Sequence, residues 1–235
     1  MITRKEVSVP QFYQGYLDSV KEDDLMEALT KNTRQFRKFL KNIPGKKINY
    51  AYAEGKWTVK ELLQHIIDAE RVFVYRALSF ARKDGANLPP FDENVWAITA
   101  KAPKRKWNDL VDEFRSLRAA NLAFFASLDE EQLQQMGTAN NNIISVVGLG
   151  FVVAGHVAHH MRIITERYLD KDDGVKKIKT EKEAKAPKQK EEKIKKEKKA
   201  KKEEKEVNVK KEKKQEKKKQ KNAKKAQAAA VKALK

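Results

Sequence analysis

The histidines of this chain are concentrated, because three of the four lie within five residues, at positions 156, 159 and 160. His156 and His160 are four residues apart, so on a helix their imidazoles lie one turn apart and can point at the same place. Neutral imidazole binds divalent metals, but a metal site needs more than two protein ligands. The remaining histidine is His65, so the chemistry depends on whether the fold brings it to this pair.

His159 is rotated by about 100° from His160 on a helical wheel. We therefore place it on another face, as a partly exposed histidine or as one that contacts a ligand without binding the metal. The alternative for the pair is that His156 and His160 are core histidines hydrogen-bonded to their neighbours. Histidines at this spacing are frequent by chance, so the spacing alone leaves both interpretations open.

The segment around the pair has the periodicity of a helix from about Ser145 to Tyr168. Residues that recur at steps of four and three share one face, and here these are Leu149, Val153, His156, His160, Ile163 and Arg167. Glycines at positions 148, 150 and 155 lower the helical propensity of this segment. We expect them to permit close packing against a neighbouring helix.

His65 lies in another predicted helix, which begins at the capping box Thr58-Val59-Lys60-Glu61 and runs to about Arg82. Its predicted inward face carries His65 and Arg76 among apolar residues. Two polar side chains on such a face lower stability unless they find partners. A site built in the core of a helical bundle would supply them.

Two further helices complete the predicted fold. One begins at Asp23 or Asp24 and ends at Pro44-Gly45, and the other runs from about Asn108 to Ser127. The second has an apolar face formed by Leu110, Phe114, Leu117, Asn121 and Phe124. We expect residues 1–22 to form a short arm laid on the bundle, residues 84–106 a long structureless connection, and residues 128–142 an acidic and then Asn-rich turn. With no convincing strand pattern, the fold class is all-α, an antiparallel four-helix bundle over residues 1–170.

The chain has 235 residues and a formal net charge of +19, which is unevenly distributed. Residues 171–235 hold 28 Lys and 12 Asp or Glu, so they carry +16, against +3 for residues 1–170. This composition cannot bury a core, and it predicts a disordered or transiently helical basic C-terminal tail. The charge favours salt-dependent contact with nucleic acid or another anionic partner, although a merely solubilising tail has the same composition.

The absence of cysteine excludes disulfides, thiolate ligands and a cysteine nucleophile. The most apolar stretch, Ile143 to Ala154, has the length of a core helix and not of a membrane span. The first residues lack the apolar run of a signal peptide. We therefore expect a cytoplasmic protein with no membrane segment.

Several motifs along the chain are informative in their order. They are Trp57 to His65 followed by Glu70 to Arg76, then Pro90 to Trp96, then Leu117 to Asn121, and finally Gly155-His156, His159-His160 and Glu166 to Tyr168. Together they resemble the DinB-like (YfiT-like) family of metal-binding four-helix bundles, over about residues 20–170. The resemblance implies a metal site with one histidine from the second helix and two from the fourth, which are His65, His156 and His160. Val157 stands where that family often has an acidic residue, so a supporting carboxylate is missing there.

The family's members are described as metal-dependent hydrolases, and relatives transfer or isomerise groups with small thiols such as bacillithiol, mycothiol or glutathione. Three imidazoles leave coordination positions open. The resemblance and the ligand type favour zinc or nickel, and iron and manganese are also compatible with imidazole.

Three other residues are candidates for catalysis. Asp68, one turn from His65, and Asp92, in the long connection beside Glu93, could act as general bases. For each acidic residue the ordinary alternative is a solvated face or a loop cap. Arg76 could bind a substrate carboxylate, or it could be the structural partner of a buried acid such as Asp92.

The predicted function is a metal-dependent enzyme that hydrolyses a small-molecule substrate or transfers a group with a low-molecular-weight thiol. The alternative is a non-catalytic metal-binding module that its basic tail recruits to nucleic acid or another anionic partner. A homodimer is compatible with a bundle of this type, but no residue pattern selects it.

Overall fold

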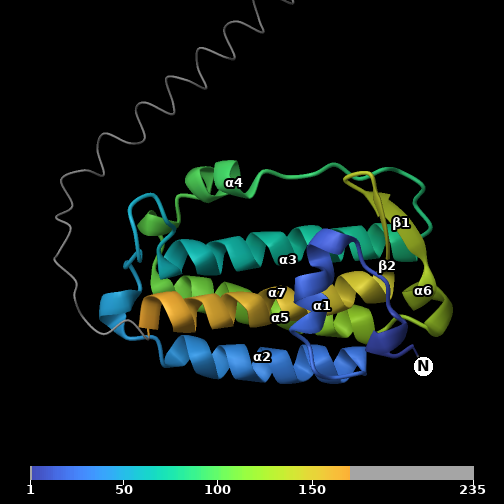
Figure 1. The fold of residues 1–235 in the computed structure, drawn as a ribbon, viewed down its shortest axis with the longest axis horizontal. Coiled ribbons are helices and arrows are strands. Elements are labelled where there is room, and N and C mark those ends of the chain that lie inside the picture. The colour runs from blue at the N-terminus through green and yellow to red at the C-terminus, as the bar shows by residue number, and fades with distance from the viewer. Residues whose placement is uncertain (1, 170–235) are drawn as a thin grey trace, which may run out of the picture. The chain divides into compact units, whose positions relative to one another are not determined.

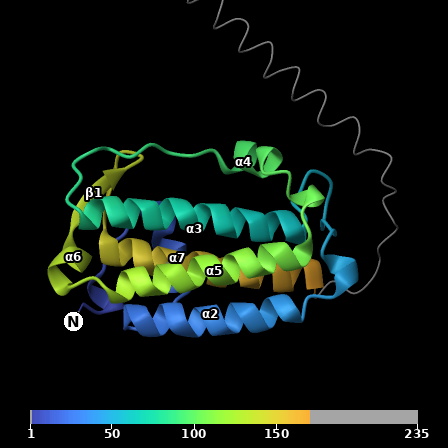
Figure 2. The same ribbon diagram turned by 180° about the vertical axis from the view of Figure 1, so that it is seen from behind.

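Four long helices form the body of the protein in a computed structural model, which describes residues 2–169. They are α2 (Leu25–Lys41), α3 (Val59–Ala81), α5 (Trp107–Ala126) and α7 (Val146–Ile164), which is followed by a π-helical turn, Thr165–Leu169. The helices lie side by side in one bundle (Figure 1), and the view from behind shows the same arrangement (Figure 2). The four-helix bundle is therefore confirmed, whereas the predicted basic tail, 171–235, lies outside the described residues.

The direction of the helices follows from one long connection. Helices α3 and α7 run antiparallel, but α3 and α5 run in the same direction, because the chain between them returns along the length of the bundle (Figure 1). The sequence predicted a structureless connection, and this prediction is wrong. The connection contains the helix α4 (Glu93–Thr99) and a 3-10 turn, Ala102–Lys104.

The helix starts are set by side chains that accept hydrogen bonds from free backbone N–H groups. Asp24 accepts from the Glu27 N–H at 2.7 Å, and Ser145 accepts from the Gly148 N–H at 3.0 Å. Thr58 and Glu61 form the predicted capping box at the start of α3. Three of the four predicted helix starts are thus confirmed at the cap itself.

Residues 128–142 differ from the predicted turn. They form the short helix α6 (Glu130–Gln134) and, with the residues up to Ser145, an antiparallel hairpin of β1 (Met136–Ala139) and β2 (Asn142–Ser145). Asn140 and Asn141 link the strands with φ of 51° and 59°. Asparagine tolerates this left-handed region, and two such residues match the twist of a tight hairpin. The Asn-rich stretch is therefore a hairpin signal, and the prediction of a plain turn is wrong.

The buried face of α5 differs from the predicted one at two positions, and Leu110, Phe114 and Asn121 are buried as predicted. Arg118 and Phe125 are buried, in place of Leu117 and Phe124. Arg118 is 0% exposed and donates to Glu70 on α3 with two bonds, of 2.8 and 2.6 Å. Asn121 donates to the same carboxylate at 2.8 Å. A buried guanidinium was not expected on this face, and its bidentate carboxylate partner explains how it can lie there.

The N-terminal arm lies on the bundle, as predicted, and it packs against α7. It consists of a 3-10 turn, Gln11–Tyr13, and the one-turn helix α1 (Gln14–Asp18). A Cβ at Gly155 would lie only 2.0 Å from the Tyr16 carbonyl oxygen, so only glycine permits this approach. At Gly150 a Cβ would lie 2.7 Å from the Leu25 side chain on α2. Both glycines therefore permit the close packing expected of them.

The segment Val146–Leu169 is long and apolar enough to cross a membrane by length and composition alone. From the sequence we predicted no stretch of this length, because we considered only the most apolar part, Ile143 to Ala154. In the bundle this segment lies between α2 and α3, and 72% of its most apolar window is buried. Its hydrophobicity is accounted for by its position as the core helix.

Candidate metal centre

The fold brings His65 to the histidine pair. His65 extends from α3 and His156 and His160 extend from α7, and these two helices are antiparallel neighbours. The Nε2 atoms of His65 and His156 lie 3.1 Å apart, and those of His156 and His160 lie 3.0 Å apart. The ligand atoms of all three lie within 4.8 Å of one another. Two nitrogens bound to the same ion at about 2.1 Å lie roughly 3.0–3.4 Å apart, so the two measured edges, His65–His156 and His156–His160, fit one shared ion.

Burial keeps the three imidazoles neutral. His156 is 3% and His160 9% exposed, and His65 is half-buried. Loss of hydration lowers the pKa of His65 to about 4 and that of His160 to about 3. Burial, followed by the neighbouring His160 and His65, also lowers the pKa of His156 well below its ordinary value. At neutral pH all three are therefore unprotonated, the form that binds a metal.

One ring nitrogen of the cluster lacks a hydrogen bond. The Nδ1 atom of His160 is buried and has no hydrogen-bond partner among residues 2–169. A metal-binding histidine usually donates this second N–H to a carboxylate or a carbonyl. The apolar and buried Val157 offers no acceptor for it, so the His160 ring is oriented by its packing and by the 3.0 Å contact of its Nε2 with His156 Nε2.

Aromatic rings surround the three histidines. Trp57 lies 4.9 Å from His65 between ring centroids, Phe73 lies 5.5 Å from His156, and Tyr16 lies 5.3 Å from both His156 and His159. Trp57 precedes α3, Phe73 belongs to α3 and Tyr16 belongs to the arm. The sequence did not place Trp57 or Tyr16 beside the histidines, because no local pattern shows where the segments before a helix pack.

His159 lies outside the cluster, as expected. Its side chain is half-buried, and its Nδ1 lies 3.4 Å from the guanidinium of Arg162. The His159 ring contacts the rings of Tyr16 and His160, with centroid distances of 5.3 and 5.2 Å. It therefore packs against one of the three clustered histidines without joining them.

Asp68 is one turn from His65, but its side chain is held elsewhere. Its carboxylate accepts from Gln64 Nε2 at 2.9 Å and lies 3.6 Å from Arg71. It lines an open polar pocket of about 330 Å³ with Gln64, Trp96, Thr99, Ala100 and Arg105, a lining that does not include the three histidines. These contacts give Asp68 a structural role, and the geometry offers no support for it as the base.

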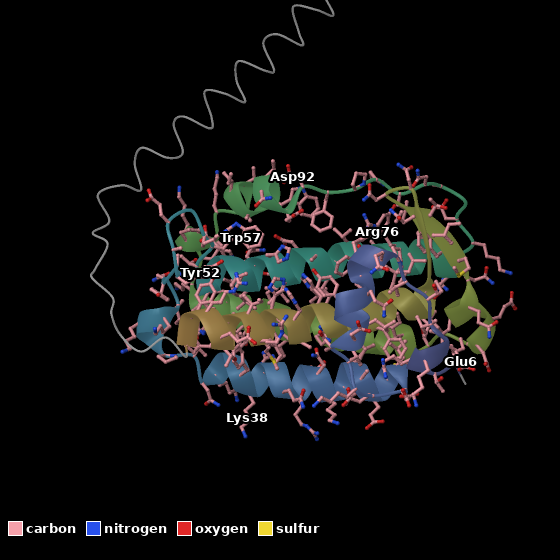
Figure 3. All side chains as sticks on the ribbon, viewed as in Figure 1. Glu6, Lys38, Tyr52, Trp57, Arg76 and Asp92 are labelled. Atoms are coloured by element: carbon pink, nitrogen blue, oxygen red, sulfur yellow. The ribbon has the colours of Figure 1, made fainter. Side chains whose placement is uncertain are left out.

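Arg76 is buried, as predicted, but its partners differ from the one expected. Its guanidinium donates to the Pro89 carbonyl at 2.8 Å and contacts the Tyr13 hydroxyl at 3.4 Å. Asp92 accepts from the N–H groups of Asn94 and Val95 and so caps α4. The proposed pairing of Arg76 with Asp92 is therefore wrong, because α4 needs that carboxylate at its own start. Figure 3 shows Asp92 by α4 and Arg76 farther along α3.

Glu93, the neighbour of Asp92, is the acidic residue that acts on the site. Its negative charge raises the pKa of His65, against the larger lowering by burial. Burial raises the pKa of Tyr16, and the charges of Tyr13 and Glu93 raise it further. Glu93 is exposed on the first turn of α4. From the sequence we identified Glu93 only as the neighbour of Asp92. The sequence alone could not tell which of the two acidic residues caps a helix, because that depends on where the helix begins.

The helical bundle and its three converging neutral histidines place the protein in the class of helical bundles with a candidate metal site in the core. Comparison with known proteins narrows this class. A family model described as the DinB superfamily matches residues 28–164. The chain belongs to the DinB superfamily.

Three relatives carry similar names. A protein of Oceanobacillus iheyensis, named "Putative metal-dependent hydrolase OB0413", is 27% identical over 133 residues, which cover 55% of this chain and 75% of that protein. A Bacillus cereus protein with the same kind of name is 24% identical over 135 residues, covering 56% and 76%. A protein of Geobacillus kaustophilus, also so named, is 38% identical over 55 residues, covering 23% and 31%.

One solved structure is also similar. It is that of YfiT from Bacillus subtilis, described as "a probable metal-dependent hydrolase with an unusual four-helix bundle topology". It is 17% identical, covers 68% of this chain and 90% of its own, and has a TM-score of 0.47.

Proposed function

We propose that the protein is a metal-dependent enzyme that hydrolyses a small-molecule substrate or transfers a group with a low-molecular-weight thiol. The observation that carries this proposal is the convergence of the Nε2 atoms of His65, His156 and His160, at 3.0 and 3.1 Å along the two shorter edges. The names of the relatives support the hydrolytic form of the proposal.

The donor set fits a divalent ion, with zinc or nickel as the first candidates. Three neutral imidazoles would hold it and leave coordination positions open, as in catalytic sites. A bound ion would supply a Lewis acid and a water or thiol of lowered pKa. The surrounding rings of Trp57, Phe73 and Tyr16 limit the access of bulk water and strengthen the interactions of charges within the site.

A side chain of the protein must act as the general base and accept the proton that the attacking water or thiol loses. Glu93 is the preferred candidate, because its negative charge raises the pKa of both His65 and Tyr16. Asp68 and Asp92 are less suitable, since hydrogen bonds hold their carboxylates to Gln64 and to the start of α4. Arg76 would act as an anchor for the arm and the long connection through Tyr13 and Pro89.

The metal content of the full-length protein, purified without a histidine tag, tests the proposal. We expect about one equivalent of metal by mass spectrometry, lost in His65→Ala and in His160→Ala and retained in the control His159→Ala. Loaded protein is then assayed with ester and amide probes and with pairs of a small thiol and an electrophilic acceptor. Folded protein that takes up no metal after reconstitution would contradict the proposal.

A second candidate function is suggested by the +16 charge of residues 171–235, which lie outside the described part of the chain. In this proposal the bundle is a metal-binding module that the tail recruits to an anionic partner such as nucleic acid. Binding of DNA or RNA that weakens steeply with salt, and is lost on removal of residues 171–235, would support it. Equal binding without those residues would exclude it.

A further inference from the structure

The N-terminal arm places one tyrosine ring against a histidine of the candidate metal centre. Tyr16, on α1, lies edge-on to His156 with ring centroids 5.3 Å apart and an interplanar angle of 79°. It lies at the same distance from His159. The arm is distant in sequence from both metal-binding helices, so this contact exists only because α1 is seated on α7.

The position of Tyr16 is closely defined. Gly155, directly before His156, lets the arm backbone approach so near that a Cβ there would lie 2.0 Å from the Tyr16 carbonyl oxygen. Directly after Tyr16, Leu17 and Val20 are each 5% exposed in the core. The backbone of Tyr16 is therefore fixed by a tight contact with α7 and by two buried neighbours, which is how a preorganised site fixes a functional side chain.

The hydroxyl of Tyr16 differs from those of Tyr13, Tyr52 and Tyr168, each of which has a hydrogen-bond partner. Tyr13 is contacted by Arg76, Tyr52 accepts from Arg167 at 3.0 Å, and Tyr168 donates to the Trp57 carbonyl at 2.7 Å. Within residues 2–169, Tyr16 has no hydrogen-bond partner for its hydroxyl. Burial and the nearby Tyr13 and Glu93 raise its pKa, so the group remains a protonated donor at neutral pH.

We propose that Tyr16 contacts the ligand of the metal centre and donates a hydrogen bond to an anionic oxygen bound there. The chemical class is an oxyanion: a carboxylate, a hydroxamate, or the oxygen that becomes negative when a carbonyl is attacked. This inference rests on the proposed function, because it requires a metal at His65, His156 and His160. It assigns a substrate-binding role to the arm, which the three-histidine site alone does not include.

The ring-edge contact also explains why a tyrosine is suited to this position. The aromatic ring packs against His156 and limits the movement of that ligand. The hydroxyl is attached to the same rigid ring, so the contact that fixes the ring also limits the movement of the hydroxyl. A donor held in advance costs no reorganisation when charge develops, which is the principle of an oxyanion hole.

The test uses the full-length protein loaded with Co²⁺, whose visible absorption reports on its ligands. Acetohydroxamate is titrated into wild type, Tyr16→Phe and the control Tyr75→Phe, since Tyr75 lies 57% exposed on the surface of α3. Affinity for Co²⁺ is measured separately by competition with a chelator. Phenylalanine keeps the ring packing and removes only the hydroxyl.

We expect Tyr16→Phe to bind acetohydroxamate about 10- to 100-fold more weakly than wild type, the usual effect of losing one hydrogen bond to a charged group. Its affinity for Co²⁺ and the behaviour of Tyr75→Phe should be unchanged. Equal affinity for acetohydroxamate in Tyr16→Phe and wild type would overturn this inference and leave the metal site intact. Loss of Co²⁺ binding in Tyr16→Phe would also overturn it, because the residue would then support the metal and not its ligand. Wild type that binds no Co²⁺ would overturn the proposed function and this inference together.

Discussion

The Nε2 atoms of His65 and His156 lie 3.1 Å apart, although 91 residues separate the two histidines in the chain. The contact joins α3 to α7, two adjacent antiparallel helices of the bundle. A ligand that binds both side chains therefore links two elements that are far apart in the unfolded chain. Binding at this point must favour the folded state.

Metal should therefore raise the stability of the wild-type protein. At free metal about a thousandfold above the dissociation constant, the gain is about 4 kcal/mol. Thermal unfolding with and without Zn²⁺ or Ni²⁺ measures it. His65→Ala should lose most of this gain and His159→Ala should keep it. An equal shift in both variants would place the bound metal elsewhere.

The metal-free protein should lose stability as the pH falls from about 6.5 to about 4. The pKa of His65 is about 4 and that of His160 about 3 in the folded state, against 6.5 when exposed. The unfolded chain thus binds more protons in this range, and stability increases with pH by up to about 1.4 kcal/mol per unit for each histidine. Urea unfolding at several pH values measures the slope. His160→Ala should reduce it, and an unchanged slope would contradict the burial of a neutral histidine.

Disruption of the Glu70–Arg118 pair should be among the most damaging single changes in the described part of the chain. Both side chains are buried, with exposures of 2% and 0%. Glu70→Met would leave an unpaired buried guanidinium and cost about 3–5 kcal/mol. The double variant Glu70→Met/Arg118→Met should recover part of the loss, because neither charge remains. Urea unfolding of wild type, Glu70→Met, Arg118→Met and the double variant provides the comparison, and additive losses would show that the two groups do not interact.

Glu93→Gln should reduce turnover by about 10²- to 10⁴-fold, the usual effect of removing a general base. Its metal content should be unchanged, since Glu93 is not among the three ligands. Asp92→Asn is the matched control, because asparagine also caps a helix. Steady-state kinetics on a probe that wild type converts measures both. A larger loss in Asp92→Asn than in Glu93→Gln would return the role of base to Asp92.

Gly155→Ala should displace the arm. The added Cβ would meet the Tyr16 carbonyl at 2.0 Å, a backbone atom that can move only with α1. We expect a loss of about 1–3 kcal/mol and faster proteolysis near Tyr16. Gly150→Ala should cost less, because its Cβ would meet the end of the Leu25 side chain, which can rotate. Equal proteolysis of Gly155→Ala and wild type would show that the arm tolerates the change.

Local sequence determined the features that depend on short-range interactions. Helix starts at Asp24, Thr58 and Ser145 follow from side chains that accept from N–H groups three residues away. The spacing of His156 and His160 puts them on one face of a helix, and the apolar stripe of α3 directs His65 inward. Together with the family resemblance, these patterns predicted the three residues that the fold brings together.

Tertiary structure decided what depends on contacts between distant segments. The burial of Arg118 required Glu70 from another helix, which the periodicity of α5 alone could not show. Asp92 caps α4 and Arg76 bonds to Pro89, because the long connection folds in a way that its own residues do not specify. Tyr16 meets His156 because Gly155 lets the arm lie against α7. Each of these contacts gains its free energy from two segments at once, so neither segment alone reveals it.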